Sequence, residues 1–450
     1  MKKILVFAVV TLFSISVFAQ PVFDYNGIYY KPTSSTTVSV IANPDGTKYS
    51  GDITIPYTVK RGTIDFTVTS IADSAFFQCK ELTSIDLPTS IAVIGKESFC
   101  GCRLLKSIKL PNITNVPYDA FCGCKELESV DISNVTTIDE FAFYSCSSLK
   151  SINIPNVITI GERAFVQCKS VERVDMPNVE IIESGAFSNC IYLKSVNMPK
   201  VTAIAEEAFY SCYRVVSIDI PNVTMIGYSA FGYCSYLQKV VLGNVDSIKK
   251  EAFSQCRSLD TFRITAAIPP VLEDDVFKDT PSDVLIQVPC GASSLYERVE
   301  GWNNFKNYEE WVPEVTVMSN DEKMGLVILD RQATCENPTA EMEAVPRSGY
   351  EFVKWSDEST ENPRVVAVED KDITLTAIFQ KVGTDVENVG IEGVTIYSDG
   401  TVLHVEGAEK EYQIYSTTGS LLYRGTDAEV ALPRGIYVVR YGNAIEKVVL

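Results

Sequence analysis

Cysteine is the residue whose type and spacing in this sequence most directly suggest chemistry. Nine of the 13 cysteines recur at a step of 23 residues once and of 22 residues thereafter. They are Cys79, Cys102, Cys124, Cys146, Cys168, Cys190, Cys212, Cys234 and Cys256. Regularly spaced thiols can pair as disulfides, bind zinc or act as nucleophiles. Here each one follows a phenylalanine by three residues and precedes a leucine or valine by three, which favours a repeated core position and predicts nine reduced, buried thiols.

The repeat that carries these cysteines contains a strand followed by a turn. In "LKSINIPNVITIGERAFVQC", Ile152 and Ile154 alternate with polar residues, as in a strand with one buried face, and Pro155 closes the strand. The later part, "IGERAFVQC", places Ile, Ala, Phe and Cys at helix-turn spacing. A single unit cannot bury both sides, so neighbouring units must stack, with parallel strands about 4.8 Å apart.

These residues resemble the BspA-like leucine-rich repeat, whose pattern runs L-x-x-I-x-L-P…I-G-x-x-A-F-x-x-C. The resemblance covers residues 71–265 as nine repeats. It implies a leucine-rich repeat solenoid with parallel strands on one face and short helical turns on the other, followed by two small all-β domains. Residues 20–70 resemble the amino-terminal β cap of such solenoids, and residues 266–310 resemble the carboxy-terminal cap. Caps would cover apolar end faces and unpaired strand edges.

Two β-rich segments follow the caps. Residues 311–380, with Tyr350, Trp355 and "NPRVV", resemble the divergent internalin-type B-repeat. Residues 381–450, which include "GIYVVRYGNAIEKVVL", resemble the carboxy-terminal sorting domain of type IX secretion substrates. That second resemblance implies the outer-membrane secretion machinery as a partner, and release from the cell or attachment to its surface. A further adhesive β-sandwich is the alternative.

The first 19 residues, in "MKKILVFAVVTLFSISVFAQ", read as a secretory signal peptide with cleavage after Ala19. No later stretch is apolar enough to span a bilayer, so the mature chain is expected to have no transmembrane segment. We therefore expect an exported protein at the cell surface or in the extracellular medium.

Charge and composition exclude several functions. The formal net charge is −19, and loss of the signal peptide with Lys2 and Lys3 lowers it by two more. Such a surface repels phosphates, which argues against a nucleic-acid partner. The only histidine, His404, lies in the last segment, so the solenoid can contain neither a Ser-His-Asp catalytic triad nor a metal site with a histidine ligand. We expect no enzyme, no cofactor and no metal.

The outward positions of the strands form the candidate binding strip. One row is mostly serine, and in the other aspartate alternates with lysine or asparagine, so that like charges do not face each other. The strip comprises Ser84, Asp86, Ser107, Lys109, Ser129, Asp131, Ser151, Asn153, Arg173, Asp175, Ser195, Asn197, Ser217 and Asp219. The expected partner is a protein ligand on a host or bacterial surface, bound without catalysis. Glycan capture and a self-assembling structural role are the alternatives, and a merely solvated sheet surface is the alternative for any single residue.

Four cysteines lie outside the repeat position. Cys100 and Cys122 occur in two "CGC" sequences one repeat apart, where adjacent strands would bring them within the Cα range of a disulfide. A Cys100–Cys122 bridge and plain unpaired thiols both fit the sequence. Cys290 and Cys335 fall in the carboxy-terminal cap and the next segment, and the sequence does not indicate their partners.

Overall fold

The computed structural model describes residues 21–110, 112–369, 372–382, 394–398, 402–416, 420–442 and 444–450. The predicted signal peptide lies outside these described residues. The chain divides into two compact units, Met1–Val312 and Pro313–Leu450, which are described separately. Across the described residues, no helix combines the length and apolar character that a bilayer span requires.

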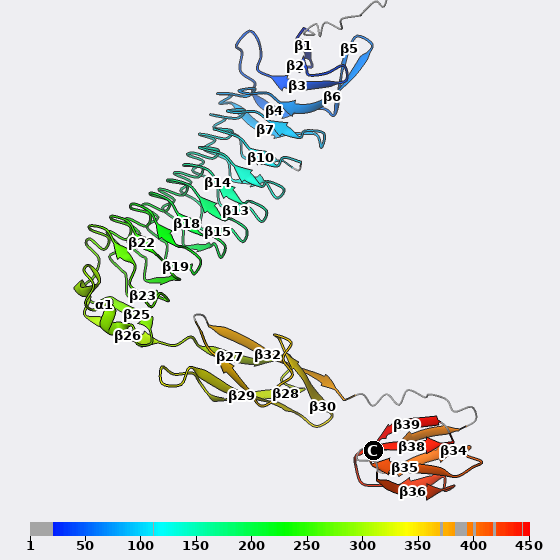
Figure 1. The fold of residues 1–450 in the computed structure, drawn as a ribbon. Coiled ribbons are helices and arrows are strands. Elements are labelled where there is room, and N and C mark those ends of the chain that lie inside the picture. The colour runs from blue at the N-terminus through cyan, green and yellow to red at the C-terminus, as the bar shows by residue number, and fades with distance from the viewer. Residues whose placement is uncertain are drawn as a thin grey trace, which may run out of the picture. The chain divides into compact units, whose positions relative to one another are not determined.

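The first unit is a solenoid in which each repeat contributes one strand to the same face (Figure 1). The nine strands are β7 (Leu82–Asp86), β9 (Ser107–Lys109), β11 (Ser129–Asp131), β13 (Ile152–Asn153), β15 (Arg173–Asp175), β17 (Ser195–Asn197), β19 (Ser217–Ile220), β21 (Lys239–Leu242) and β23 (Thr261–Ile264). Pairing is parallel and in register, with Arg173 opposite Ser195 and Asp175 opposite Asn197. The predicted solenoid with parallel strands is thus confirmed.

A second parallel ladder of two-residue strands runs along the solenoid. It contains β8 (Val93–Ile94), which pairs with the cap, and a sheet of eight strands from β10 (Asn115–Val116) to β24 (Val271–Leu272). The asparagine of the Pro-Asn-Val segment ties the turns together beside this ladder. Asn156 donates to the Ser133 carbonyl at 2.7 Å, and Asn178 donates to the Pro155 carbonyl at 2.7 Å.

The side of each repeat that carries phenylalanine and cysteine consists of tight turns and contains no helix. Residues such as Glu207 and Ser211 adopt left-handed φ values of 56° and 58°, which break the helical hydrogen-bond pattern. Backbone amides instead donate to the next turn, as Phe209 does to the Ala230 carbonyl at 2.8 Å. The expected turns are present but are not helical, and the only α-helix among the described residues is α1 (Ser293–Tyr296), in the cap.

Phenylalanine and cysteine fill the same inward position in every turn. Phe76, Phe99, Phe121, Phe143, Phe165, Phe187, Phe209, Phe231 and Phe253 stack with ring centroids 5.1–5.4 Å apart and planes within 1–9°. All nine repeat cysteines are buried and free, so the core position predicted for them is confirmed.

Caps extend the sheet beyond the nine repeats. At the amino-terminal end, β4 (Gly51–Thr54) pairs with β7, beside a sheet of β1 (Phe23–Tyr25), β2 (Ile28–Pro32), β3 (Thr37–Ile41), β6 (Ile64–Ile71) and β5 (Thr58–Arg61). At the other end, β25 (Leu285–Pro289) and β26 (Asn307–Trp311) follow β23 in parallel. Trp302, fully buried in the 3-10 turn η1 (Trp302–Asn304), closes this end of the core.

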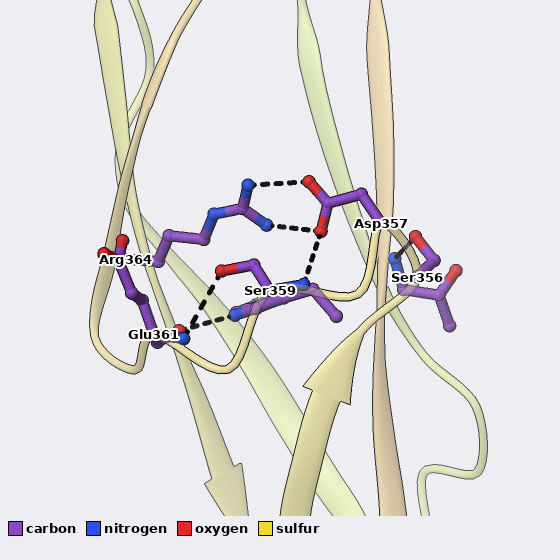
Figure 2. Close-up of polar contacts among 7 residues, drawn as sticks. Ser356, Asp357, Ser359, Glu361 and Arg364 are labelled. Carbon is purple, nitrogen blue, oxygen red and sulfur yellow. Dashed lines mark hydrogen bonds and ion pairs between the residues drawn. The ribbon is translucent and has the colours of Figure 1, made fainter.

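The second unit begins with two three-stranded sheets. One contains β27 (Val315–Ser319), β32 (Ile373–Lys381) and β30 (Tyr350–Trp355), and the other contains β28 (Gly325–Arg331), β29 (Thr339–Pro346) and β31 (Arg364–Ala367). Figure 2 shows how the connection from β30 to β31 is held: Arg364 makes two parallel hydrogen bonds to Asp357, at 2.8 and 2.6 Å. Trp355 is buried here, as expected for a core aromatic residue.

The last part of the second unit is also all-β. One sheet contains β33 (Thr395–Ser398), β34 (Val402–Glu406) and β37 (Glu429–Ala431). The other contains β36 (Leu421–Gly425), β35 (Tyr412–Ser416), β38 (Ile436–Tyr441) and β39 (Ala444–Val449). Leu403, Ile414 and Val439 are buried in their common core. Two small all-β domains therefore follow the solenoid, as the sequence predicts.

Candidate binding surface

All fourteen residues of the predicted strip lie on the outward side of the strands and are exposed. Their inward neighbours, such as Ile108 and Val174, are buried. Successive side chains of a strand point to opposite faces, and one face is buried here. The serine row and the aspartate row therefore lie on the same exposed surface. We call this surface the strand-face strip: Ser84, Asp86, Ser107, Lys109, Ser129, Asp131, Ser151, Asn153, Arg173, Asp175, Ser195, Asn197, Ser217 and Asp219.

The aspartate row is ordered by contacts between turns. Asp131 lies opposite Lys109, and Asp175 lies opposite Asn153 on one side and Asn197 on the other. The Asn197 amide donates to the Asp175 carboxylate at 2.6 Å. The predicted separation of like charges is confirmed at these pairs, and the carboxylates are presented in a fixed order along the strip.

Two ion pairs border the strip, between the residues just before β11 and β13 and between those just before β15 and β17. Lys150 contacts Glu128 at 2.6 Å, and Lys194 contacts Glu172 at 2.8 Å. The hydrogen bond from Lys150 holds the pKa of the Glu128 carboxyl below its usual range. Because these pairs are exposed, they add little stability, but they restrict the side chains on each side of the turns.

The same surface continues into both caps. Asp52 of β4 accepts hydrogen bonds from Thr83 at 2.7 Å and Ser84 at 2.6 Å. Beyond the last repeat, Arg263 donates to Gln287 at 2.9 Å, and Gln287 donates to Glu309 at 2.7 Å. The sequence interpretation missed these extensions because the cap strands lack the repeat motif.

Exposed tyrosines beside the strip were also missed. Tyr192, Tyr213, Val216 and Tyr236 are 45%, 40%, 43% and 59% exposed, and Arg214 is exposed between them in sequence. We call these five residues the tyrosine ledge. The signal was in the sequence: of eight tyrosines between residues 71 and 265, six fall between residues 192 and 236.

One cavity outside this surface is lined by two carboxylates, Glu273 and Asp275. It lies in the carboxy-terminal cap beside Phe277 and Phe305, with a volume of about 290 Å³. Its carboxylate Glu273 accepts a hydrogen bond from Lys249 at 2.9 Å, which lowers the pKa of Glu273. A general acid needs the opposite shift. Among the described residues, no group of three or more His, Cys, Asp or Glu is placed to hold a metal ion.

The structure brings Cys100 and Cys122 together as free, half-buried thiols. Their side chains share a hydrogen bond, which lowers the pKa of the Cys100 thiol and raises that of Cys122. The backbone between them is also joined, since the Gly101 amide donates to the Cys122 carbonyl at 2.7 Å. The two thiols are adjacent and free here, and the Cys100–Cys122 disulfide stays a prediction.

Comparison with known families agrees with two of the three resemblances. Residues 69–179 and 158–282 match the BspA type leucine rich repeat region, in six copies, and residues 315–383 match the divergent InlB B-repeat domain. No curated protein gives a significant match.

Several solved structures are similar to part of this chain. A leucine rich cell surface protein from Faecalibacterium prausnitzii A2-165 is 21% identical, with 64% of this chain and 94% of that chain covered and a TM-score of 0.36. A leucine-rich repeat protein from Bacteroides ovatus is 22% identical, with 64% and 99% covered and a TM-score of 0.36. The pneumococcal vaccine antigen PcpA is 16% identical, with 64% and 98% covered and a TM-score of 0.30.

Proposed function

We propose that this chain, which contains a BspA-type leucine-rich repeat region, is a non-catalytic cell-surface or secreted protein that binds a protein ligand along the strand-face strip. The observation that carries the proposal is the exposure of all fourteen strip residues on one parallel-strand surface. Solenoids present extended surfaces of this kind to their partners, and leucine-rich repeat regions generally bind proteins.

Binding would proceed by shape and hydrogen-bond complementarity. The serine hydroxyls both donate and accept, the aspartates accept, and Lys109 and Arg173 donate. Because contacts such as Asn197 to Asp175 already order the side chains, less conformational entropy is lost when a ligand docks. The polar character of the strip fits a reversible interface better than an obligate one.

The test is a charge reversal on the strip with a matched control. Asp131, Asn153 and Asp175 are replaced together by lysine, and binding of the purified protein to bacterial and epithelial cells is measured by flow cytometry. The control replaces Glu180, Glu183 and Thr202, which lie beside the second ladder, by lysine. Both triple variants change two acids and one neutral residue, so their net charges are equal.

We expect the strip variant to lose at least tenfold in apparent affinity and to remain folded. Its thermal midpoint should be only a few degrees below wild type, since the substitutions are exposed but place a lysine at position 131 opposite Lys109 and lysines at positions 153 and 175 opposite each other. The control variant should bind as wild type does. Equal binding by the strip variant and the control would refute the proposal. A self-assembling role would show instead as concentration-dependent oligomers that the strip variant disrupts.

We further propose that the segment 381–450 is a type IX sorting domain, which places the protein on the cell surface or outside the cell. Support comes from its resemblance to such domains and from its all-β fold. Deletion of residues 384–450 should leave the protein in the periplasm, as followed by fractionation and immunoblotting. Normal surface display of the deleted chain would contradict this, and would favour the reading of the segment as another adhesive domain.

A further inference from the structure

The tyrosine ledge repeats one position over three successive turns. Tyr192, Arg214 and Tyr236 each follow their repeat cysteine by two residues and precede the strand by three. Adjacent turns are joined here by the Tyr236 amide, which donates to the Tyr213 carbonyl at 3.1 Å. Stacked turns therefore hold one arginine between two exposed tyrosines, directly beside the strand-face strip.

Arg214 is oriented by its neighbour. Its guanidinium carbon lies 5.1 Å from the centroid of the Tyr192 ring, which is within the range of a cation–π contact. Among the residues that the structure describes, no carboxylate forms an ion pair with Arg214. This contact restrains the guanidinium and leaves its hydrogen-bond donors available to a planar bidentate acceptor.

The charge of this region is opposite to that of the chain. Segments 191–195, 213–217 and 235–239 together carry Lys194, Arg214 and Lys239 and contain no aspartate or glutamate, whereas the whole chain has a net charge of −19. Lys194 forms an ion pair with Glu172 at 2.8 Å, whereas among the described residues no carboxylate forms an ion pair with Arg214 or Lys239. A cationic patch on an acidic protein selects an anionic partner.

We infer that the tyrosine ledge is a docking site for an acidic segment of the protein ligand, in which an aspartate or glutamate carboxylate binds Arg214 and adjacent apolar side chains cover Tyr236 and Val216. This inference rests on the proposed function and specifies the partner. Tyrosine and arginine are the residue types most enriched at binding hot spots.

The test uses a phage-displayed library of random 12-residue peptides selected on the full chain. We expect the enriched peptides to carry aspartate or glutamate beside an apolar or aromatic residue. A synthetic copy of one such peptide should bind Arg214→Gln and Tyr236→Ser at least tenfold more weakly than wild type, by fluorescence anisotropy. Arg257→Gln is the matched control, because Arg257 is also exposed, lies two turns beyond Arg214 and donates to Gln255 of its own turn at 2.7 Å.

A double-mutant cycle then links the two partners. The peptide with glutamate changed to glutamine should bind the wild-type chain weakly, and Arg214→Gln should weaken that peptide no further. Enriched peptides without acidic residues, or peptides indifferent to Arg214→Gln, overturn the inference. So does binding of polygalacturonate, an anionic polysaccharide, at the ledge when no acidic peptide binds there.

Failure of this inference is distinguishable from failure of the proposed function. The Asp131, Asn153 and Asp175 lysine variant leaves the ledge residues unchanged. Peptide binding that persists in that variant and is lost in Arg214→Gln supports the ledge whatever the strip does. Cell binding that is lost in the strip variant and kept in Arg214→Gln supports the strip alone and contradicts the ledge.

Discussion

The Sγ atom of Cys168 donates a hydrogen bond to the backbone carbonyl of Phe143, the stacked phenylalanine of the preceding turn, at 3.3 Å. Each of the other repeat cysteines from Cys102 to Cys256 makes the same contact to the phenylalanine carbonyl of the preceding repeat, at 3.1–3.3 Å. The cysteine therefore fills the core and also gives a second hydrogen bond to a buried carbonyl, since the Phe143 carbonyl already accepts the Cys146 amide at 3.1 Å. This double role explains why the solenoid repeats a thiol without pairing it.

Buried thiols of this kind should resist modification. Burial raises the pKa of Cys190 and Cys234 to about 12, so little thiolate forms at neutral pH. Iodoacetamide at pH 8, followed by peptide mass spectrometry, should modify half-buried Cys100, whose pKa is lowered, first, and the nine repeat cysteines only after unfolding. Rapid labelling of the repeat cysteines in the native protein would contradict the packing described here.

Cys100 and Cys122 should form a bridge when an oxidant is supplied. Diamide accepts two electrons and two protons from the two thiols, and non-reducing peptide maps should then show a Cys100–Cys122 disulfide. Because the bridge closes a loop of one repeat, it should raise the free energy of unfolding by up to about 3 kcal/mol. Cys100→Ser should remove both the bridge and the gain, and cross-links to repeat cysteines instead would disprove the adjacency.

The phenylalanine stack should dominate the stability of the solenoid. Phe165 packs between Phe143 and Phe187 at centroid distances of 5.1 and 5.2 Å and is fully buried. Phe165→Ala should lower the free energy of unfolding by about 3–5 kcal/mol, measured by urea titration. Phe165→Leu, which keeps most of the volume, should cost about half as much or less. A loss below about 1 kcal/mol for the alanine variant would show that the stack contributes little.

Acid should weaken the B-repeat domain through Asp357. The hydrogen bonds from Arg364 hold the pKa of Asp357 below its ordinary value of 3.8, so the pair stabilises the fold above that pH and the stabilisation is lost as the pH falls through the lowered pKa. Arg364, whose side chain is 13% exposed, anchors the connection seen in Figure 2. Arg364→Ala should lower the free energy of unfolding of this domain by about 1 kcal/mol at pH 7. This value is small because solvent screens the partly exposed Asp357.

The 19F signal of fluorotryptophan at Trp355, assigned with Trp355→Phe, reports this domain separately during urea titration. For the wild type, the urea concentration at which half of this domain is unfolded should decrease when the pH is lowered from 5 to 3. For Arg364→Ala it should decrease less over the same interval. Parallel curves for the two proteins would assign the acid sensitivity to other groups.

Sequence periodicity was sufficient to predict the solenoid and the strip. Alternation around Ile152 and Ile154 identifies the buried and exposed sides of a strand, and the 22-residue step transfers that assignment to every turn. The second ladder was missed because a strand of two residues, such as Asn115–Val116, is too short to show alternation. The turns were expected to be helical because residues such as Glu207, which adopt left-handed φ values here, are not of a type that indicates this conformation in the sequence.

The ledge was missed for a different reason. Whether the side chain two residues after the cysteine faces solvent depends on the turn conformation, which the periodic pattern does not determine. Tyr192 and Tyr236 read equally well as core aromatics until the structure shows them exposed. The repeat pattern also does not predict the extensions in the caps. Asp52 and Gln287 lie on strands that pair with the repeat strands but lack the repeat motif.

Site-specific photo-cross-linking tests the central claim, recognition along the strand face, most directly. A benzophenone amino acid is placed at Asn153 on the strip or at Arg163 on the turn side, both of which are exposed, and each protein is irradiated on the cells it binds. The account predicts a covalent adduct with a surface protein from position 153 and none from position 163. Adducts from position 163 alone, or equally from both positions, would contradict it.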